Sequence, residues 1–242
     1  MQRDFGAGGR VGIGTPQANP TVEPELSAML PQNVASYTVR LTSGAASPDE
    51  RLVAYLTELP GTLDGFDTLA LDCFAFACTG SSYLIGEERE RTLVDGIQAD
   101  RGYPVFTAAA AIRAELGRLG ANRIAILAPY PQNIVAAAQA YWSAAGFEVL
   151  AVRPIEIGSS DTRAIYELGS RDALNALSVF CAANPSLDVD AFVFTGTGMP
   201  TAPILAAAEA RTGRPVLASN YCLALACARH LGAEGALRRE FG

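Results

Sequence analysis

A cysteine at the end of an apolar run has the surroundings that best suit catalysis in this chain. Residues 66–77 are mostly apolar, Cys78 ends the run, and small polar residues and a glycine follow at 79–82. This pattern predicts a buried parallel strand that opens into a helix-starting loop. A thiol at that point would face backbone N–H groups, which favour a thiolate and bind anions. Cys78 is therefore our candidate nucleophile or base, although a cysteine in such a place is more often a small core residue.

An internal repeat predicts a second loop opposite the first. The sequence Gly-Tyr-Pro-Val at 102–105, followed by an Ala-rich helix, recurs as Gly-Arg-Pro-Val at 213–216, followed by a helix rich in Ala and Cys. An apolar strand with a Thr-Gly loop precedes each copy, so that Cys78 corresponds to Gly196. Such a repeat implies two related halves. If their strand ends face each other, Cys78 and Gly196 lie on opposite walls of one cleft.

The rest of the chain alternates strands with helices. Apolar runs predict strands at 10–14, 35–41, 68–77, 102–106, 123–127, 147–153 and 191–194. Ser47 before Pro48 is a typical helix start, which predicts a helix to about residue 59, and Gly120 ends the Ala-rich helix at 107–119. This alternation predicts parallel α/β sheets.

Composition and charge exclude several classes of protein. The 242 residues carry a net charge of −7 and no Lys/Arg run, which argues against a nucleic-acid or membrane partner. No apolar stretch is long enough to span a membrane and no secretion signal is evident, so we expect a cytoplasmic protein. Five cysteines without a C-x-x-C pair and a single histidine predict neither disulfides nor a metal site. Among the other thiols, Cys222 at a helix start is the second candidate for reactivity.

The chain resembles the aspartate/glutamate racemase superfamily, and within it the maleate isomerase and arylmalonate decarboxylase group. The resemblance rests on TPQAN at 15–19 with VEPE at 22–25, FACTGSS at 76–82, APY at 128–130 with Asn133, and TGTG at 195–198. It implies two flavodoxin-like, three-layer α/β/α domains with parallel sheets, related by a pseudo-twofold axis, with the active site in the cleft between them and no cofactor. We expect residues 1–116 and 220–242 to form the first domain and residues 117–219 the second.

The resemblance also implies roles for individual residues. Cys78 matches a thiol that acts as nucleophile or base, and Tyr130 matches a phenol that hydrogen-bonds the substrate carboxylate. Asn19 matches an amide of the first loop that holds the substrate. The predicted catalytic residues are thus Cys78 and Tyr130, and the predicted substrate-binding residues are Asn19, Thr79, Gly80, Ser81, Gly196, Thr197 and Gly198. The glycines are equally consistent with tight turns.

Gly196 departs from the pattern of the superfamily. Racemases carry a second cysteine there, and the decarboxylases keep that cysteine but have a glycine in place of the first. Racemisation needs an acid and a base on opposite faces of the substrate, which one thiol does not supply. Cis–trans isomerisation needs one nucleophile that adds and leaves, and decarboxylation needs one acid beside an enediolate-binding pocket. Thr162 stands where maleate isomerases are expected to have an Asn.

The sequence therefore predicts a cofactor-independent isomerase of the maleate isomerase kind, which acts on a small carboxylate or dicarboxylate through Cys78. An arylmalonate-type decarboxylase with a single first-half thiol is the alternative. A third hypothesis is a non-catalytic, two-lobed carboxylate-binding protein. Members of the superfamily often associate, so a homo-oligomer is also open.

Overall fold

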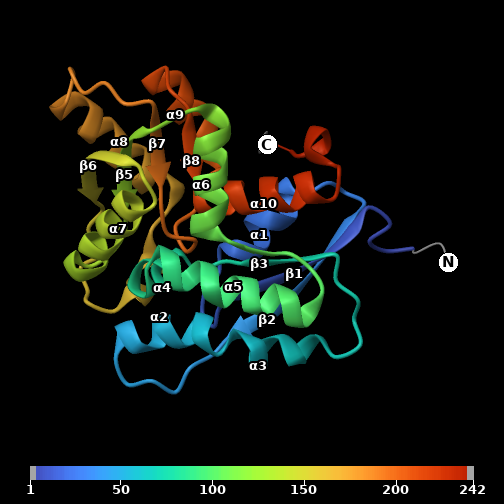
Figure 1. The fold of residues 1–242 in the computed structure, drawn as a ribbon. Helices are drawn as coiled ribbons and strands as arrows, with labels where there is room; N and C mark the ends of the chain where they lie inside the picture. Colours follow the sequence, from blue (N-terminus) through green and yellow to red (C-terminus); the bar gives the residue numbers. More distant parts are fainter. Residues whose placement is uncertain (1–3, 239–242) are drawn as a thin grey trace.

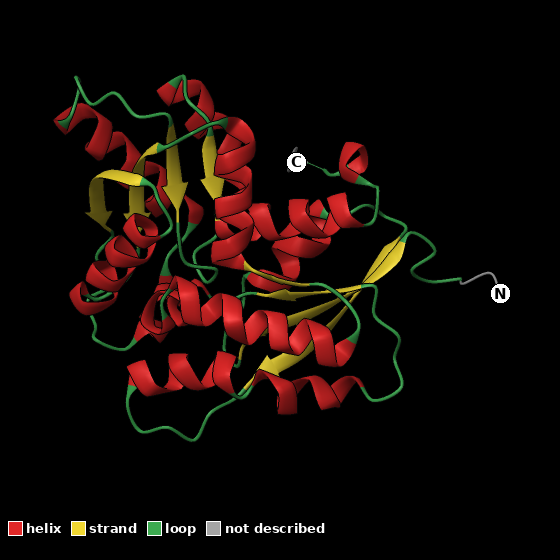
Figure 2. Cartoon of the chain, in the orientation of Figure 1, coloured by secondary structure: helices red, strands yellow, loops and turns green. Residues whose placement is uncertain are grey.

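Two parallel sheets with equivalent strand orders form the described part of the chain, residues 4–238 of the computed structural model (Figure 1). Within these residues, one four-stranded sheet has the order β2-β1-β3-β4 and the other has the order β6-β5-β7-β8. Neighbouring strands run parallel throughout, and helices pack along both sheets (Figure 2). This strand order is that of flavodoxin-like domains. The predicted fold class is confirmed.

The elements alternate as the sequence predicts. The strands are β1 (Gly9–Pro16), β2 (Val34–Leu41), β3 (Cys73–Phe76), β4 (Val105–Thr107), β5 (Arg123–Ala128), β6 (Glu148–Pro154), β7 (Ala191–Phe194) and β8 (Val216–Ala218). The helices are α1 (Val22–Met29), α2 (Pro48–Thr57), α3 (Leu59–Leu63), α4 (Thr79–Ile85), α5 (Glu87–Arg101), α6 (Ala108–Leu119), α7 (Gln132–Ala144), α8 (Ser170–Ala183), α9 (Leu205–Thr212) and α10 (Ser219–His230). Short 3₁₀ turns are η1 (Asp64–Phe66), η2 (Thr162–Glu167), η3 (Ala202–Ile204) and η4 (Glu234–Ala236).

Local sequence signals explain where several elements begin. The Ser47 hydroxyl accepts from Glu50 N at 3.2 Å, and the Glu50 carboxylate accepts from Ser47 N at 3.4 Å, so a capping box starts α2. Strand β3 is shorter than predicted: it begins at Cys73, and not at residue 68. The turn η1 is followed by Asp67 with a φ of 46°, and pairing with β1 begins only near Cys73.

The last helix of the chain crosses to the first sheet. Helix α10 follows β8 but packs against α6, α1 and β3. Helix α6 follows β4 and lies near the second sheet (Figure 1), where it shares a surface groove with α9 and β8. The packing of α10 supports placing residues 220–238 in the first domain, although the domain limits remain a prediction. The predicted boundary after residue 116 falls inside α6, and residues 1–3 and 239–242 lie outside the described range.

An aromatic cluster joins the two halves beside the strand ends. Tyr83 of α4 makes edge-on contacts with Tyr130, Tyr141 and Trp142. Trp142 Nε1 also donates to the Tyr83 hydroxyl at 3.2 Å, and both side chains are almost fully buried. Large buried aromatic rings contribute most to such an interface. The cluster therefore fixes α4, which follows Cys78, against the second half.

Candidate active site

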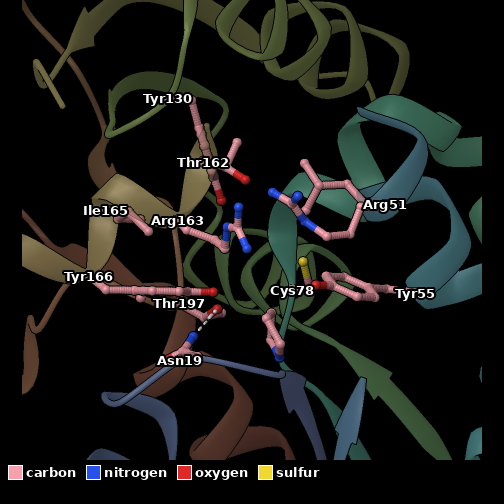
Figure 3. Close-up of a pocket in the computed structure, with 13 residues that line it drawn as sticks. Asn19, Arg51, Tyr55, Cys78, Tyr130, Thr162, Arg163, Ile165, Tyr166 and Thr197 are labelled. Carbon is pink, nitrogen blue, oxygen red and sulfur yellow. Dashed lines mark hydrogen bonds between the residues drawn. The ribbon is translucent and has the colours of Figure 1, made fainter. Parts of the chain in front are cut away.

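A pocket lies where the strand ends of the two halves meet. Its walls follow the carboxyl ends of β1, β3, β5 and β7, the edge at which α/β sheets bind ligands. The lining residues are Pro16, Asn19, Arg51, Leu52, Tyr55, Cys78, Tyr130, Thr162, Arg163, Ile165, Tyr166, Thr197 and Gly198 (Figure 3). Its free space is about 30 Å³. A buried water needs roughly 10–15 Å³, so this space holds about two or three waters. A dicarboxylate is larger than that.

The structure brings together five of the predicted site residues and leaves four behind the wall. Those that line the pocket are Asn19, Cys78, Tyr130, Thr197 and Gly198. Those that do not line it are Thr79, Gly80, Ser81 and Gly196. Members of the second group support the first through hydrogen bonds or packing, as the following contacts show. Their direct contact with a substrate remains a prediction.

Cys78 lies between the end of β3 and the first residue of α4. Its side chain is 4% exposed. Burial raises the pKa of the Cys78 thiol, while the Ser81 hydroxyl, the backbone N–H groups of Gly80 and Ser81, and the positive charge of Arg51 lower it. The first effect is the largest, so the resting thiol is neutral at pH 7 and is not the thiolate that the sequence predicts. These donors and Arg51 would stabilise a negatively charged sulfur if one formed during a reaction.

A chain of hydroxyl groups connects the two walls behind the pocket. Gly196 N donates to Thr79 Oγ1 at 3.1 Å, and Thr79 Oγ1 lies 2.9 Å from the Tyr130 hydroxyl oxygen. When Thr79 donates its proton to Tyr130, the proton of Tyr130 is left for the pocket, which its side chain lines. Burial, followed by the nearby Cys78, holds the pKa of Tyr130 well above its usual value, so the phenol keeps its proton. Tyr130 is thus placed as a neutral donor.

The amide of Asn19 is oriented by its neighbours. Its Oδ1 accepts from Thr21 N at 2.9 Å and from Val22 N at 3.3 Å, which caps the start of α1. Its Nδ2 therefore lies on the pocket side, where it donates to Thr197 Oγ1 at 3.3 Å (Figure 3). An amide nitrogen carries two protons, so Asn19 has one more to offer an anion. Thr197 Oγ1 in turn donates to Ala77 O at 2.8 Å, which engages its only proton.

The wall opposite Cys78 is closed around Gly196. Its φ is +90°, and a Cβ built there would lie 2.7 Å from Ile165 Cδ1 and 2.8 Å from Pro129 Cγ. A Cβ on Gly198 would lie 2.7 Å from the Tyr166 ring. Gly196 is favoured by its backbone conformation and by these neighbouring side chains, whereas Gly198 is favoured by the close approach of Tyr166. A cysteine at 196 would therefore strain the backbone and require Ile165 and Pro129 to shift.

Several pocket residues were missed from the sequence. Arg51 and Tyr55 come from α2, and Arg163 and Tyr166 come from η2. Figure 3 shows the guanidinium groups of Arg51 and Arg163 directed toward each other, with Tyr55 next to Cys78. A signal for α2 exists in retrospect, because it follows the loop after β2 and so starts near the strand ends. No comparable signal marks η2, except that Thr162 stands where maleate isomerases are expected to have an Asn. Thr162 does line the pocket.

The lining gives the pocket a positive character. Its charged side chains are the arginines Arg51 and Arg163, and no Asp or Glu is among the lining residues.

Within residues 4–238, no cluster of His, Cys, Asp and Glu is suited to hold a metal ion. The second candidate thiol, Cys222, is buried in α10 and does not line the pocket. The same described range contains no helix long and apolar enough to cross a membrane.

Comparison with known proteins identifies the family. The family model of arylmalonate decarboxylase matches residues 12–239. The chain belongs to the arylmalonate decarboxylase family. Maleate isomerase of Pseudomonas putida is 28% identical over 239 residues, which cover 93% of this chain and 92% of that protein. These matches confirm the predicted group and the prediction of an enzyme.

Solved structures of family relatives confirm the two-domain fold. The maleate isomerase Iso of Pseudomonas putida S16 aligns with a TM-score of 0.82 at 24% identity, over 96% of this chain and 98% of that one. A variant of the Nocardia farcinica maleate cis-trans isomerase aligns with a TM-score of 0.79 at 24% identity, over 96% of both chains. The latter structure holds a covalently bound succinylcysteine intermediate.

Proposed function

We propose that this protein is a cofactor-independent isomerase that converts a small cis-dicarboxylate into its trans isomer, with Cys78 as the nucleophile. The observation that carries the proposal is the asymmetric pocket, in which Cys78 is the one thiol among the lining residues and Gly196, behind the opposite wall, carries none. Addition and elimination need one nucleophile, whereas racemisation needs two groups on opposite faces. The names of the relatives and the succinylcysteine of the Nocardia farcinica enzyme support this choice.

The charge of the pocket favours a doubly negative substrate. Arg51 and Arg163 face the space beside Cys78, and the Asn19 amide offers a further proton from the other side. Arginine and amide groups bind carboxylates through charge-assisted hydrogen bonds. The whole chain carries a net charge of −7, so this positive lining is a local property of the pocket.

The residues present allow a balanced addition and elimination. The Cys78 sulfur forms a bond to one alkene carbon while the π electrons move to the neighbouring carbon and its carboxylate. Tyr130 gives its proton to that carbon and receives the proton of the thiol. The central bond is then single and rotates. Tyr130 takes a proton back from the carbon, the double bond re-forms, and sulfur leaves and regains its proton. No oxidant, reductant or net proton is required.

The directions in which burial shifts the pKa of Cys78 and of Tyr130 are consistent with these roles. A thiol whose pKa is raised by burial keeps its proton until the substrate arrives, and the donors around Cys78 lower the cost of the negative sulfur that forms. Tyr130 remains protonated before the reaction. Proton transfer between two groups that line one small pocket avoids a charged resting state.

Decarboxylation of a malonate-like acid is the second candidate, favoured by the family model that matches the chain. In that reaction loss of carbon dioxide leaves an enediolate, which the Tyr130 hydroxyl and Asn19 amide would stabilise. Cys78 would then protonate the carbanion. One thiol is sufficient for this chemistry also.

Proton NMR in deuterated buffer tests the proposal. The protein is incubated separately with maleate, aspartate, glutamate and aryl- and alkylmalonates. We expect the trans isomer to form from maleate and no inversion of the amino acids. Loss of carbon dioxide from a malonate without turnover of maleate would establish the second candidate instead. Ligand-dependent melting with no turnover of any compound would indicate a binding protein.

A further inference from the structure

One carboxylate holds both arginines of the pocket. Arg51 Nη2 lies 2.8 Å from Asp161 Oδ1, and this ion pair joins α2 to the segment before η2. Arg163 donates from Nε to both oxygens of Asp161, at 3.1 and 2.9 Å, and its backbone N donates at 2.9 Å. Asp161 itself is not among the residues that line the pocket. The charge of the two arginines is therefore partly balanced by one carboxylate of the protein, which leaves the pocket a net positive charge.

The two arginines differ in how they depend on Asp161. Arg163 is a near neighbour in sequence and its side chain is 58% exposed. The Arg51 side chain is 12% exposed and reaches Asp161 from the other half of the chain. A guanidinium so deeply placed needs an anionic partner, because a buried charge without one is costly. Asp161 would keep its Arg163 contacts if Arg51 turned away, so an exchange leaves neither group unpaired.

We propose that Arg51 exchanges Asp161 for a carboxylate of the substrate, and that it thereby selects substrates with two negative charges. This inference rests on the proposed function and names the group that recognises the second carboxylate. The free space beside Cys78, about 30 Å³, requires that something move before a dicarboxylate enters. Release of the Arg51–Asp161 pair breaks the contact between α2 and the segment before η2. The same change leaves the Arg51 guanidinium free to bind the substrate.

The consequence for Asp161 is opposite to that of an ordinary stabilising ion pair. Its carboxylate competes with the substrate for Arg51. Removing its charge should therefore strengthen dicarboxylate binding, whereas loss of a purely structural link between the halves would weaken binding.

Binding measured without turnover tests the inference. Calorimetry is performed on the Cys78→Ser protein with maleate and with its monoamide, which has the same skeleton and one charge fewer. We expect maleate to bind about 10- to 100-fold more tightly, the range of one charge-assisted hydrogen bond. Adding Arg51→Gln should remove this preference and leave monoamide affinity unchanged. Adding Asp161→Asn should tighten maleate binding.

A control and the contrary results complete the experiment. Arg101→Gln removes another ion pair, that with Asp64 at 2.7 Å, and should leave both affinities unchanged. Equal loss of affinity for the two ligands in the Arg51 variant, weaker maleate binding in the Asp161 variant, or no maleate binding at all would overturn the inference. A preference for maleate that depends on Arg51, together with an absence of isomerisation by the unmodified protein, would leave the inference standing and refute the proposed reaction.

Discussion

Replacing Gly196 by alanine tests whether the wall opposite Cys78 is closed. The substitution adds only a Cβ, which would lie 2.7 Å from Ile165 Cδ1 and 2.8 Å from Pro129 Cγ. The backbone at 196 has a φ of +90°, which an L side chain rarely adopts. Two separate costs are therefore expected, one from conformation and one from packing.

The magnitude of each cost follows from this geometry. A side chain in a left-handed conformation costs about 1–2 kcal/mol, and overpacking a closed site costs about 1–3 kcal/mol. We expect Gly196→Ala to lower the free energy of unfolding by about 2–5 kcal/mol, the sum of these two ranges. Gly146 provides a matched control, because its φ is +91° and nothing lies within 4 Å of a Cβ built there. Gly146→Ala should incur only the conformational cost.

Urea unfolding of the two variants separates the contributions. The difference in unfolding free energy between Gly196→Ala and Gly146→Ala isolates the packing cost at 196, which we expect to be about 1–3 kcal/mol. Equal destabilisation by the two substitutions would show that the wall has room for a side chain. That result would refute the packing argument against a second thiol.

Three further predictions concern the pocket and its support. Because burial raises the pKa of Cys78, its alkylation by iodoacetamide should accelerate with pH to a midpoint above that of a free cysteine, and a midpoint near neutrality would contradict this. Thr79→Val should remove the partner of Tyr130 and the acceptor of Gly196 N, lowering kcat and costing about 1–3 kcal/mol of stability in urea unfolding; unchanged values would oppose the hydroxyl relay. Burial raises the pKa of Glu25. Protonated Glu25 therefore stabilises the fold at pH values below its pKa in the unfolded chain, and this stabilisation is lost as the pH rises through its pKa in the folded protein. Glu25→Gln should therefore flatten the pH dependence of unfolding, and a steeper dependence would contradict this.

The arrangement of strands and the first thiol were predictable because their causes are local. A buried run that ends at Cys78 and a repeat that ends at Gly196 are both visible in the sequence. Strand order then places β3 and β7 at equivalent positions in the two sheets, and the pocket lies beside the carboxyl ends of both. The capping signal at Ser47 was equally sufficient, because a helix start depends on a few adjacent residues.

The positive lining was not predictable because it depends on contacts between distant segments. Arg51 is separated in sequence from Asp161, and nothing in either neighbourhood indicates that they pair. The protonation state of Cys78 was not predictable for the same reason, because it depends on packing between distant segments. The loop after Cys78 predicts a stabilised thiolate, yet the packing of both halves buries the sulfur and the cost of desolvation prevails.

The central claim is that one thiol performs the chemistry, and turnover by Cys78→Ala tests it most directly. Cys222→Ala is the matched control, since Cys222 is also buried but lies outside the pocket. Formation of the trans isomer from maleate is measured by NMR for both variants under the same conditions. We expect no product above the buffer blank from Cys78→Ala and unchanged turnover by Cys222→Ala. Product formation by Cys78→Ala at a rate comparable to that of the unmodified protein would contradict the account.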